Sequence, residues 1–249
     1  PVTFTNPIKV EVIKIDKDKE SRFLAGRILP GIMLIMLVVG CSFIASEVSA
    51  GEKERGTLET ILCSPLSRFE LVSGKYMTVA TVGFISAMVN LGCMAFTINH
   101  IGSFMPEGSD SPFANFNMPL NIIPILIFCL ILVSFLVSGL CLIAASLART
   151  IQEASQYMIP ITLLLSLPVI SSSLPGVSME GSTRFIPFLN FCLLFQDLLV
   201  DKIIITDIVA VIFSTSIFCL LAIAILIKIY NSEDTLFNHE GHSTFSLSR

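Results

Sequence analysis

Residues 52–68 read EKERGTLETILCSPLSR and interrupt an otherwise strongly apolar chain with a dense group of charges. The hydrophobic stretches before and after this segment are each long enough to cross a bilayer, because a membrane-spanning helix needs about 20 apolar residues. The segment must therefore lie at a membrane surface, and it fixes where one crossing ends and the next begins.

This segment has the periodicity of one short amphipathic helix over residues 52–64. One face carries charged residues that can pair at intervals of three and four positions, namely Glu52, Arg55 and Glu59. Another face is apolar and carries Leu58, Ile61 and Leu62. Pro65 ends the helix, because proline lacks a backbone donor. The pattern predicts a helix lying on the membrane, and a plain solvated charge run is the alternative.

The same segment contains a misleading motif for nucleotide binding. Gly51 and Gly56, followed by Thr57, have the outer spacing of a phosphate-binding loop. The lysine that must follow the second glycine is missing, and no strand is predicted before the motif. We therefore expect no nucleotide site and no cofactor in this chain.

The composition is that of a protein with several membrane spans. Of the 249 residues, 53% are hydrophobic and only 14% are charged, and the mean hydropathy is +0.84, whereas about a quarter of the residues of a soluble domain are charged. Long apolar runs cross a bilayer as helices, so the expected fold class is an all-α polytopic membrane protein. The small net charge of −4 argues against a nucleic-acid partner.

The hydrophobic runs predict five spans, at residues 23–46, 71–98, 122–147, 154–170 and 203–230. We expect Pro30 to break the first span near its start. The second span is rich in small residues, which favours close packing inside the bundle or at a subunit interface. A tight turn at residues 149–153 makes the third and fourth spans an antiparallel hairpin.

The regions outside the spans differ in character. Residues 1–22 are polar, with an alternation over residues 8–15 that predicts a short edge strand, and we interpret them as the end of an extracytoplasmic domain and a linker. Because the chain starts at Pro1, we expect the protein to begin further upstream. Residues 185–200 are too short to cross and too apolar for water, which predicts a re-entrant or interfacial segment. Residues 231–249 are expected to be a cytoplasmic tail.

The basic residues assign the two sides of the membrane. Short cytoplasmic loops carry an excess of Lys and Arg, whereas long domains cross regardless of charge. If residues 1–27 belong to such a domain, Arg184 and Lys202 remain on one side. The other side holds Lys53, Arg55, Arg68, Lys75, Arg149, Lys228 and Arg249. This excess places the amphipathic helix, the 149–153 turn and the C-terminus in the cytoplasm.

A few polar side chains in or near the spans are candidates for a substrate pathway, because polar groups inside a bilayer are costly and often functional. They are Glu47, Asn90, Glu153 and Asn190. An interfacial position is the alternative for most of them, and a helix-to-helix hydrogen bond is the alternative for Asn90, which lies deep in a span. The sequence contains no recognisable catalytic motif or metal-ligand cluster, so an intramembrane enzyme has little support.

Several motifs resemble those of the type-2 ABC (ABC-2) exporter permeases and, more narrowly, of the sodium-extrusion permeases of the NatB group. The most specific is AGEKERGTLETIL at residues 50–62, which continues with Ser64-Pro65, Ser67-Arg68 and Gly74-Lys75. Supporting motifs are NPIKVE at residues 6–11, IPFLN at residues 186–190 and NSEDTLF at residues 231–237. The resemblance covers nearly the whole chain.

The resemblance implies a half-transporter with six spans, of which this chain contains the last five, so that the sequence is incomplete at its N-terminus. It implies a cytoplasmic ATPase subunit that binds ATP and Mg²⁺, a second permease copy that is identical or paralogous, and the cell membrane of a bacterium or archaeon. The acidic position before the main motif is usually Asp in the family, whereas this chain has Glu47.

In this interpretation the helix at residues 52–64 couples the ATPase to the spans. Its charged face meets the ATPase and its apolar face passes a rigid-body push to the membrane helices. The coupling residues are Glu52, Lys53, Glu54, Arg55, Gly56, Thr57, Leu58 and Glu59. Gly56 in the helix interior costs about 1 kcal/mol relative to alanine.

The expected function is export of a substrate, with sodium as the first candidate, driven by the partner's ATP hydrolysis. The alternatives with the same architecture are export of a drug, a lipid or a peptide. Two alternatives come from other classes of protein: a membrane scaffold that recruits a soluble partner without transport, and an intramembrane enzyme.

Overall fold

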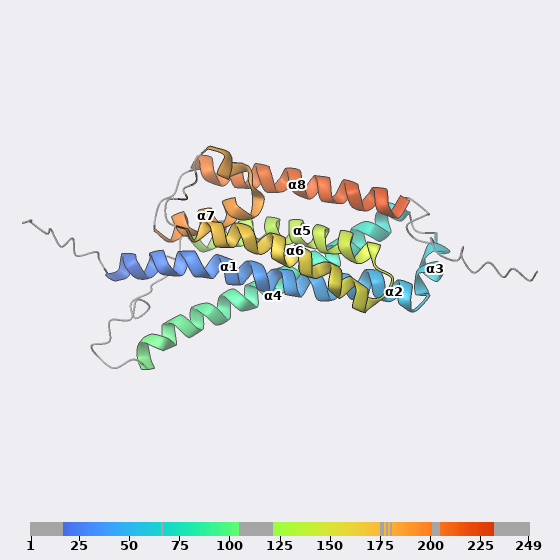
Figure 1. Ribbon diagram of the computed structural model, residues 1–249, viewed down its shortest axis with the longest axis horizontal. Coiled ribbons are helices and arrows are strands. Elements are labelled where there is room, and N and C mark those ends of the chain that lie inside the picture. Colours follow the sequence, from blue (N-terminus) through green and yellow to red (C-terminus); the bar gives the residue numbers. More distant parts are fainter. Residues whose placement is uncertain are drawn as a thin grey trace, which may run out of the picture.

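The computed structural model describes residues 17–65, 67–104, 122–174, 177, 179, 181–200 and 205–231. Within these residues every regular element is a helix (Figure 1). The elements are α1 (Lys17–Ala45), the π-helical turn η1 (Ser46–Ala50), α2 (Gly51–Glu54), α3 (Thr57–Leu62), α4 (Arg68–Phe104), α5 (Ile123–Leu147), α6 (Ile151–Ser172), the 3₁₀ turn η3 (Gly181–Phe185), α7 (Pro187–Leu199) and α8 (Ile205–Asn231). The strand expected within residues 8–15 lies outside the described residues.

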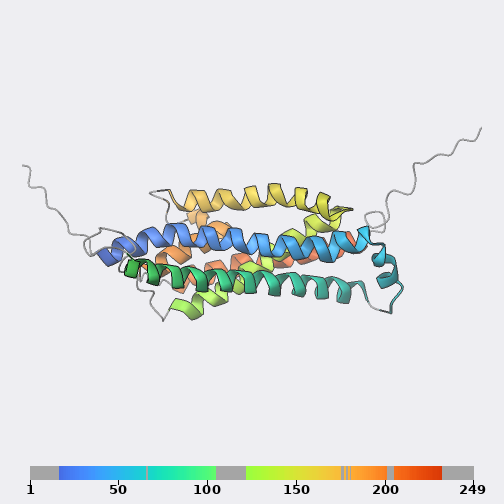
Figure 2. The ribbon, with the colours of Figure 1, turned by 90° about the horizontal axis from the view of Figure 1, so that it is seen from below.

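The described part of the chain contains five helical stretches that are long and apolar enough to cross a membrane, which confirms the predicted fold class. They are Ala25–Glu54, Arg68–Thr97, Ile123–Leu147, Ile151–Ser172 and Ile205–Tyr230. These stretches run side by side and alternate in direction along the chain (Figures 1 and 2). As a result α2, α3, the start of α4, the end of α5, the start of α6 and the end of α8 gather at one end of the bundle, which we call the junction end.

The first span is longer and more continuous than its sequence suggests. Its helix begins at Lys17, inside the expected linker, and continues through Pro30 without a break. A neighbouring membrane helix can compensate for the lost proline donor, which explains why the helix does not stop there. Near the other end, the Gly51 N–H donates to Ser46 O, five residues back, so the helix widens into a π turn before α2.

The small residues of α4 make a close contact with α1, as expected for packing inside the bundle. A Cβ atom built on Gly83 would lie 2.2 Å from the Cys41 Sγ atom, and one built on Gly40 would lie 2.8 Å from the Ser86 Cβ atom. These distances leave no room for a side chain at either glycine. By contrast, Gly74 and Gly92 face open space, so the small residues of α4 do not all serve this contact.

The third span, α5, lies at the centre of the bundle. Its most apolar window is 61% buried, whereas the corresponding window of α6 is only 17% buried. A connection of three residues, 148–150, joins the two helices, which confirms the predicted antiparallel hairpin. α6 starts three residues before the predicted span at 154, because the Thr150 hydroxyl caps it by accepting from the Glu153 N–H at 3.1 Å.

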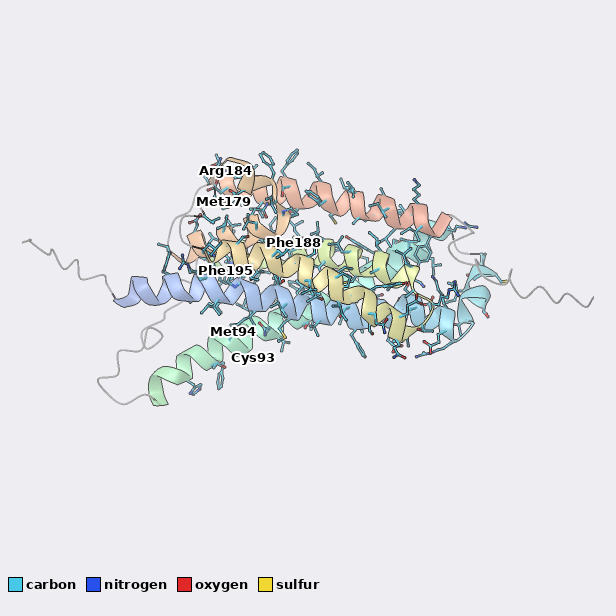
Figure 3. All side chains as sticks on the ribbon, viewed as in Figure 1. Cys93, Met94, Met179, Arg184, Phe188 and Phe195 are labelled. Atoms are coloured by element: carbon cyan, nitrogen blue, oxygen red, sulfur yellow. The ribbon has the colours of Figure 1, made fainter. Side chains whose placement is uncertain are left out.

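The segment before the last span forms a short helix inside the bundle. α7 has 13 residues, and all but two of them are buried. It packs against α1, α6 and α8, and Phe188 and Phe195 lie among these neighbouring helices (Figure 3). The chain leaves α6 and enters α8 at the same end of the bundle (Figure 1). The segment therefore enters and returns on one side, as a re-entrant segment does, and its burial argues against a helix lying at the membrane surface.

Candidate functional site

The predicted coupling helix at residues 52–64 is divided into two elements at the junction end. α2 ends at Glu54, and α3 begins at Thr57. Between them the Gly56 N–H donates to Lys53 O at 3.1 Å, and Gly56 has a φ of 70°. This left-handed conformation ends a helix and suits glycine, which has no Cβ atom to clash. The expectation of one helix with Gly56 in its interior is therefore wrong.

Glu52 binds a cation on α4. The Lys75 Nζ atom donates to Glu52 Oε2 and, at 2.8 Å, to Val48 O. The Lys75 side chain is only 6% exposed, and its ammonium group also lies 5.7 Å from the centre of the Tyr230 ring on α8. A buried lysine needs such partners, because leaving the charge unpaired away from water is costly.

Lys53 binds the C-terminal end of α5. Its Nζ atom donates to Ser146 O and, at 3.3 Å, to Ala148 O. The last carbonyl groups of a helix have no partner within the helix and carry partial negative charge, so an ammonium group is well matched to them.

Glu54 binds the N-terminal end of α6. Its Oε2 atom accepts from the Ile151 N–H at 2.8 Å. The first N–H groups of a helix need acceptors and carry partial positive charge, so a carboxylate is well matched to this end. Glu153 completes the cap by accepting from the Arg149 N–H at 2.9 Å.

Three consecutive side chains of α2 thus hold three different membrane helices. We call this group, Glu52, Lys53 and Glu54, the three-helix clamp. The expected pairing of Glu52 with Arg55 is wrong, because Lys75 takes the Glu52 carboxylate. Glu52 and Lys53 are partly buried and Glu54 is exposed, so the expected contact of these three residues with a soluble partner stays a prediction.

Arg55 pairs with a candidate pathway residue. Its Nη2 atom lies 3.0 Å from Glu47 Oε2, and the side chains are 66% and 36% exposed. Glu47 also lines a cavity of about 290 Å³ between α1 and α6, together with Ser46, Ile151 and Ser155. Arg55 therefore pairs with a carboxylate that lines this cavity.

α3 projects beyond the clamp at the junction end (Figure 1). Leu58 is buried at 4% exposure, and the Thr57 hydroxyl donates to Glu52 O at 3.2 Å. Thr57 and Thr60 are exposed. The side chain of Glu59 lies outside the described residues. Among the side chains of α3 that the structure describes, Leu58 is buried and Ile61 is partly buried, as the amphipathic pattern suggests, and the two threonines face outward.

The other two pathway candidates lie away from the junction end. Asn90 is half-buried in α4, and its Oδ1 atom is shielded from solvent without a hydrogen-bond partner in the described part of the chain. Asn190 is fully buried in α7 and donates to Ser214 on α8 at 2.8 Å and to Arg184 O at 3.1 Å. The structure therefore does not bring the four candidates together.

Asn190 belongs to a polar group where α8 begins. The Arg184 Nη2 atom lies 3.0 Å from Asp207 Oδ1, although this contact lacks hydrogen-bond geometry. The Arg184 Nε–H donates to Met179 O at 2.9 Å, and the two residues lie close together in Figure 3. No cluster of three or more His, Cys, Asp or Glu side chains among the described residues could hold a metal ion.

Sequence reasoning missed two charged residues that lie within predicted spans. Lys75 falls in the predicted span at 71–98 and Asp207 in the one at 203–230. Both are almost completely buried and both form ion pairs. Their positions alone were a usable signal, because a charged residue inside an apolar span requires a partner.

Comparisons with known proteins agree with this architecture. Residues 3–228 match the family described as "ABC-2 family transporter protein". The chain is 30% identical over 196 residues to the ABC transporter permease protein NatB of Bacillus subtilis (strain 168). This match covers 78% of the chain but only 50% of the relative, so the chain spans about half the length of the curated relative it matches. No solved structure matches the chain. Because the family match extends over most of its length, this chain belongs to the ABC-2 family of transporter proteins.

Proposed function

We propose that this chain is part of the membrane-spanning permease subunit of an ATP-driven exporter, and that a separate cytoplasmic ATPase docks on α3 and the turn at Arg55 and Gly56. In this proposal the ATPase binds ATP and Mg²⁺, a second permease copy completes the transporter, and the assembly works in the cell membrane. The membership of the ABC-2 family supports the general assignment.

One observation carries the coupling proposal. Glu52, Lys53 and Glu54 bind α4, α5 and α6 respectively, while α3 follows directly after them and projects outward. A displacement of α3 by a soluble partner is therefore passed to three membrane helices at once. Such a rigid connection is what coupling by rigid-body motion requires.

The geometry changes the proposed mechanism in one respect. The clamp side chains are already bound to α4, α5 and α6, so the partner meets mainly the exposed residues that follow them, Arg55, Gly56, Thr57 and Thr60. This surface carries one described charge, Arg55, which already pairs with Glu47. Shape and backbone contacts at the Gly56 turn, where a glycine lets another chain approach closely, then contribute more to docking than ion pairs do.

The docking proposal is tested by co-purification of the full-length permease with its ATPase. Thr60→Lys places a long charged side chain on the exposed side of α3, and we expect it to reduce the bound ATPase at least tenfold. Thr97→Lys is the matched control, because Thr97 is also an exposed threonine but lies far along α4 from the junction end. Equal ATPase recruitment by both variants would contradict docking on α3.

Sodium is the substrate that we propose, on the basis of the motif resemblance at residues 50–62. Glu47, Asn90, Glu153 and Asn190 remain the proposed pathway residues, with Glu47 lining a cavity and Asn190 buried. Uptake of ²²Na⁺ into inverted vesicles containing the full transporter should require ATP. Transport of a drug, lipid or peptide without sodium uptake would contradict this substrate, and ATPase binding without any flux would indicate a scaffold instead.

A further inference from the structure

The cavity that Glu47 lines has polar walls inside a largely apolar bundle. It lies between the first span and α6, which run side by side and in contact (Figures 1 and 2). Its volume is about 290 Å³. Besides Glu47, the hydroxyl-bearing side chains that line it are Ser42, Ser46 and Ser155. A recess with a few polar groups on apolar walls is a candidate binding site, so the chemistry of these groups decides what it can bind.

The three serine hydroxyl groups donate their protons to the backbone of their own helices. Ser42 donates to Val39 O at 2.9 Å, Ser46 to Ser42 O at 2.8 Å, and Ser155 to Ile151 O at 3.0 Å. A hydroxyl oxygen whose proton is used in this way keeps its lone pairs as acceptors. The serines therefore offer the cavity oxygen acceptors and no hydrogen-bond donors.

Glu47 gives the cavity its charge. None of the other lining side chains, all of which the structure describes, is charged. Carboxylate and hydroxyl oxygens are the ligands that hard cations prefer. One carboxylate matches a single positive charge, and the volume leaves room for a cation with several waters of about 30 Å³ each. The lining therefore favours a small monovalent cation.

A cation of the protein itself already takes this carboxylate. The Arg55 Nη2 atom lies 3.0 Å from Glu47 Oε2. In this position the guanidinium occupies a carboxylate oxygen and repels a second cation. The two side chains are 66% and 36% exposed, and such exposed pairs contribute little to stability. Arg55 is therefore placed to compete with a bound cation, and little energy is needed to remove it.

We propose that the cavity between the first span and α6 binds a small monovalent cation, and that Arg55 is a built-in competitor that releases Glu47 when a partner binds the turn at Gly56. This inference rests on the proposed function, in which the cation is sodium and the ATPase docks on that turn. An acidic group of the ATPase would attract the exposed guanidinium away from Glu47. Docking and cation binding are then coupled through one side chain.

The competition is tested with the full-length permease alone, by measuring the binding of ²²Na⁺ in a scintillation proximity assay. N-methyl-D-glucamine holds the ionic strength constant, because salt screens an exposed ion pair. Arg55→Gln should raise the sodium affinity at least tenfold, whereas Arg55→Lys keeps the positive charge and should leave the affinity low. Lys228→Gln is the matched control, because it removes an exposed positive charge from α8 without touching the cavity lining, and it should have no effect.

The place of binding is tested by second changes added to Arg55→Gln. Glu47→Gln removes the carboxylate and should abolish the tenfold gain. Ser155→Ala removes an oxygen from the α6 wall and should lower the sodium affinity severalfold. Ser166→Ala is its matched control, because Ser166 lies on the same helix and its hydroxyl also donates to the backbone, at 2.7 Å, but it does not line the cavity.

The release of Glu47 is tested with the complex obtained by co-purification. The unchanged permease with bound ATPase should approach the sodium affinity of Arg55→Gln alone. Adding the ATPase to Arg55→Gln should then raise the affinity little further. An unchanged affinity in a complex that does contain the ATPase would overturn the release of Glu47 by docking.

Two results would overturn the cation site itself. The first is an equal sodium affinity of Arg55→Gln and the unchanged permease. The second is a gain that Glu47→Gln does not remove, which is the behaviour of a general change in surface charge. Either result together with ATP-dependent sodium uptake by the full transporter would remove this site and leave the proposed function in place. Tight binding by Arg55→Gln without any sodium uptake would do the reverse.

Discussion

The two halves of the motif at residues 51–62 are neighbours in sequence but have opposite relations to the bundle. The three consecutive charged side chains of α2 bind other parts of the bundle, namely a lysine and two helix ends. α3 inserts Leu58 and otherwise presents exposed residues such as Thr57 and Thr60. Gly56 lies between the two halves, and its left-handed backbone conformation ends the first helix.

Because the two halves differ in this way, they can meet two requirements that a single continuous helix would have to meet at once. A surface that receives a partner must be accessible, whereas a connection that transmits force must be tightly bound. α3 meets the first requirement and α2 the second. Variants of α2 should therefore change the stability of the permease itself, while variants of α3 should change only its interaction with a partner.

The largest expected effect is at the ion pair between α2 and α4. Lys75→Met removes the cation beside Glu52, and we expect the free energy of unfolding to fall by about 3 kcal/mol, as when one partner of a buried pair is removed. Titration of the full-length protein with SDS, followed by circular dichroism, measures this change. The double variant Glu52→Leu/Lys75→Met should regain most of the loss, because it leaves no charge without a partner. A double variant as unstable as Lys75→Met would contradict the pairing.

A somewhat smaller effect is expected where α2 holds α5. Lys53→Met removes the ammonium group from Ser146 O and Ala148 O, which should lower the free energy of unfolding by about 2 kcal/mol, the range for hydrogen bonds to charged groups. Lys53→Arg keeps a cationic donor and should retain at least half of this stability in the same titration. If Lys53→Arg and Lys53→Met are equally unstable, the side chain acts through its fit and not through the helix end.

The boundary between the halves gives an effect of known sign. Gly56→Ala should lower the free energy of unfolding by about 1 kcal/mol, because a left-handed conformation is costly for a residue with a Cβ atom. Gly74→Ala is the control. An added Cβ atom meets nothing within 4 Å at either glycine, but Gly74 is helical, so this change should be neutral or stabilising. Destabilisation of the same size at both positions would mean that the conformation of Gly56 is not the cause.

The smallest effect is expected at Arg55, where α2 gives way to the turn. Arg55→Gln removes an ion pair whose partners are 66% and 36% exposed, so the free energy of unfolding should change by less than about 1 kcal/mol. The difference from the unchanged protein should decrease further in 0.5 M NaCl, since salt screens exposed pairs. A loss comparable to that of Lys75→Met would show that Arg55 also belongs to the inward half.

The amount that could be predicted from sequence follows from the kind of information each feature needs. The five spans can be recognised from runs of apolar residues, which are local features of the sequence. The predicted order of the spans agrees with the structure. Gly56 was predicted inside one helix, whereas it lies between two. Glycine occurs both inside helices at modest cost and at their ends, and the local pattern of Leu58, Ile61 and Leu62 favoured a continuous helix.

The partners of the clamp could not be predicted for a different reason. A carboxylate such as that of Glu54 has several donors within reach in sequence, and its actual partner, the Ile151 N–H, is 97 residues away. Periodicity along one helix favoured local pairs such as Glu52 with Arg55. The useful signal was the position of Lys75 within an apolar span. Burying its charge is costly, so an anionic partner could have been predicted, although not which residue supplies it.

The widened turn at Ser46–Ala50 determines which side chains of α2 face the neighbouring helices at the junction end. Each residue of an α-helix rotates the chain by about 100°, so the extra residue in this turn rotates everything after it by about that angle. Without it, the neighbouring glutamate would face the carbonyl end of α5 in place of Lys53, and like charges would meet. The one extra residue in η1 thus places Lys53 and Glu54 opposite helix ends of the matching sign.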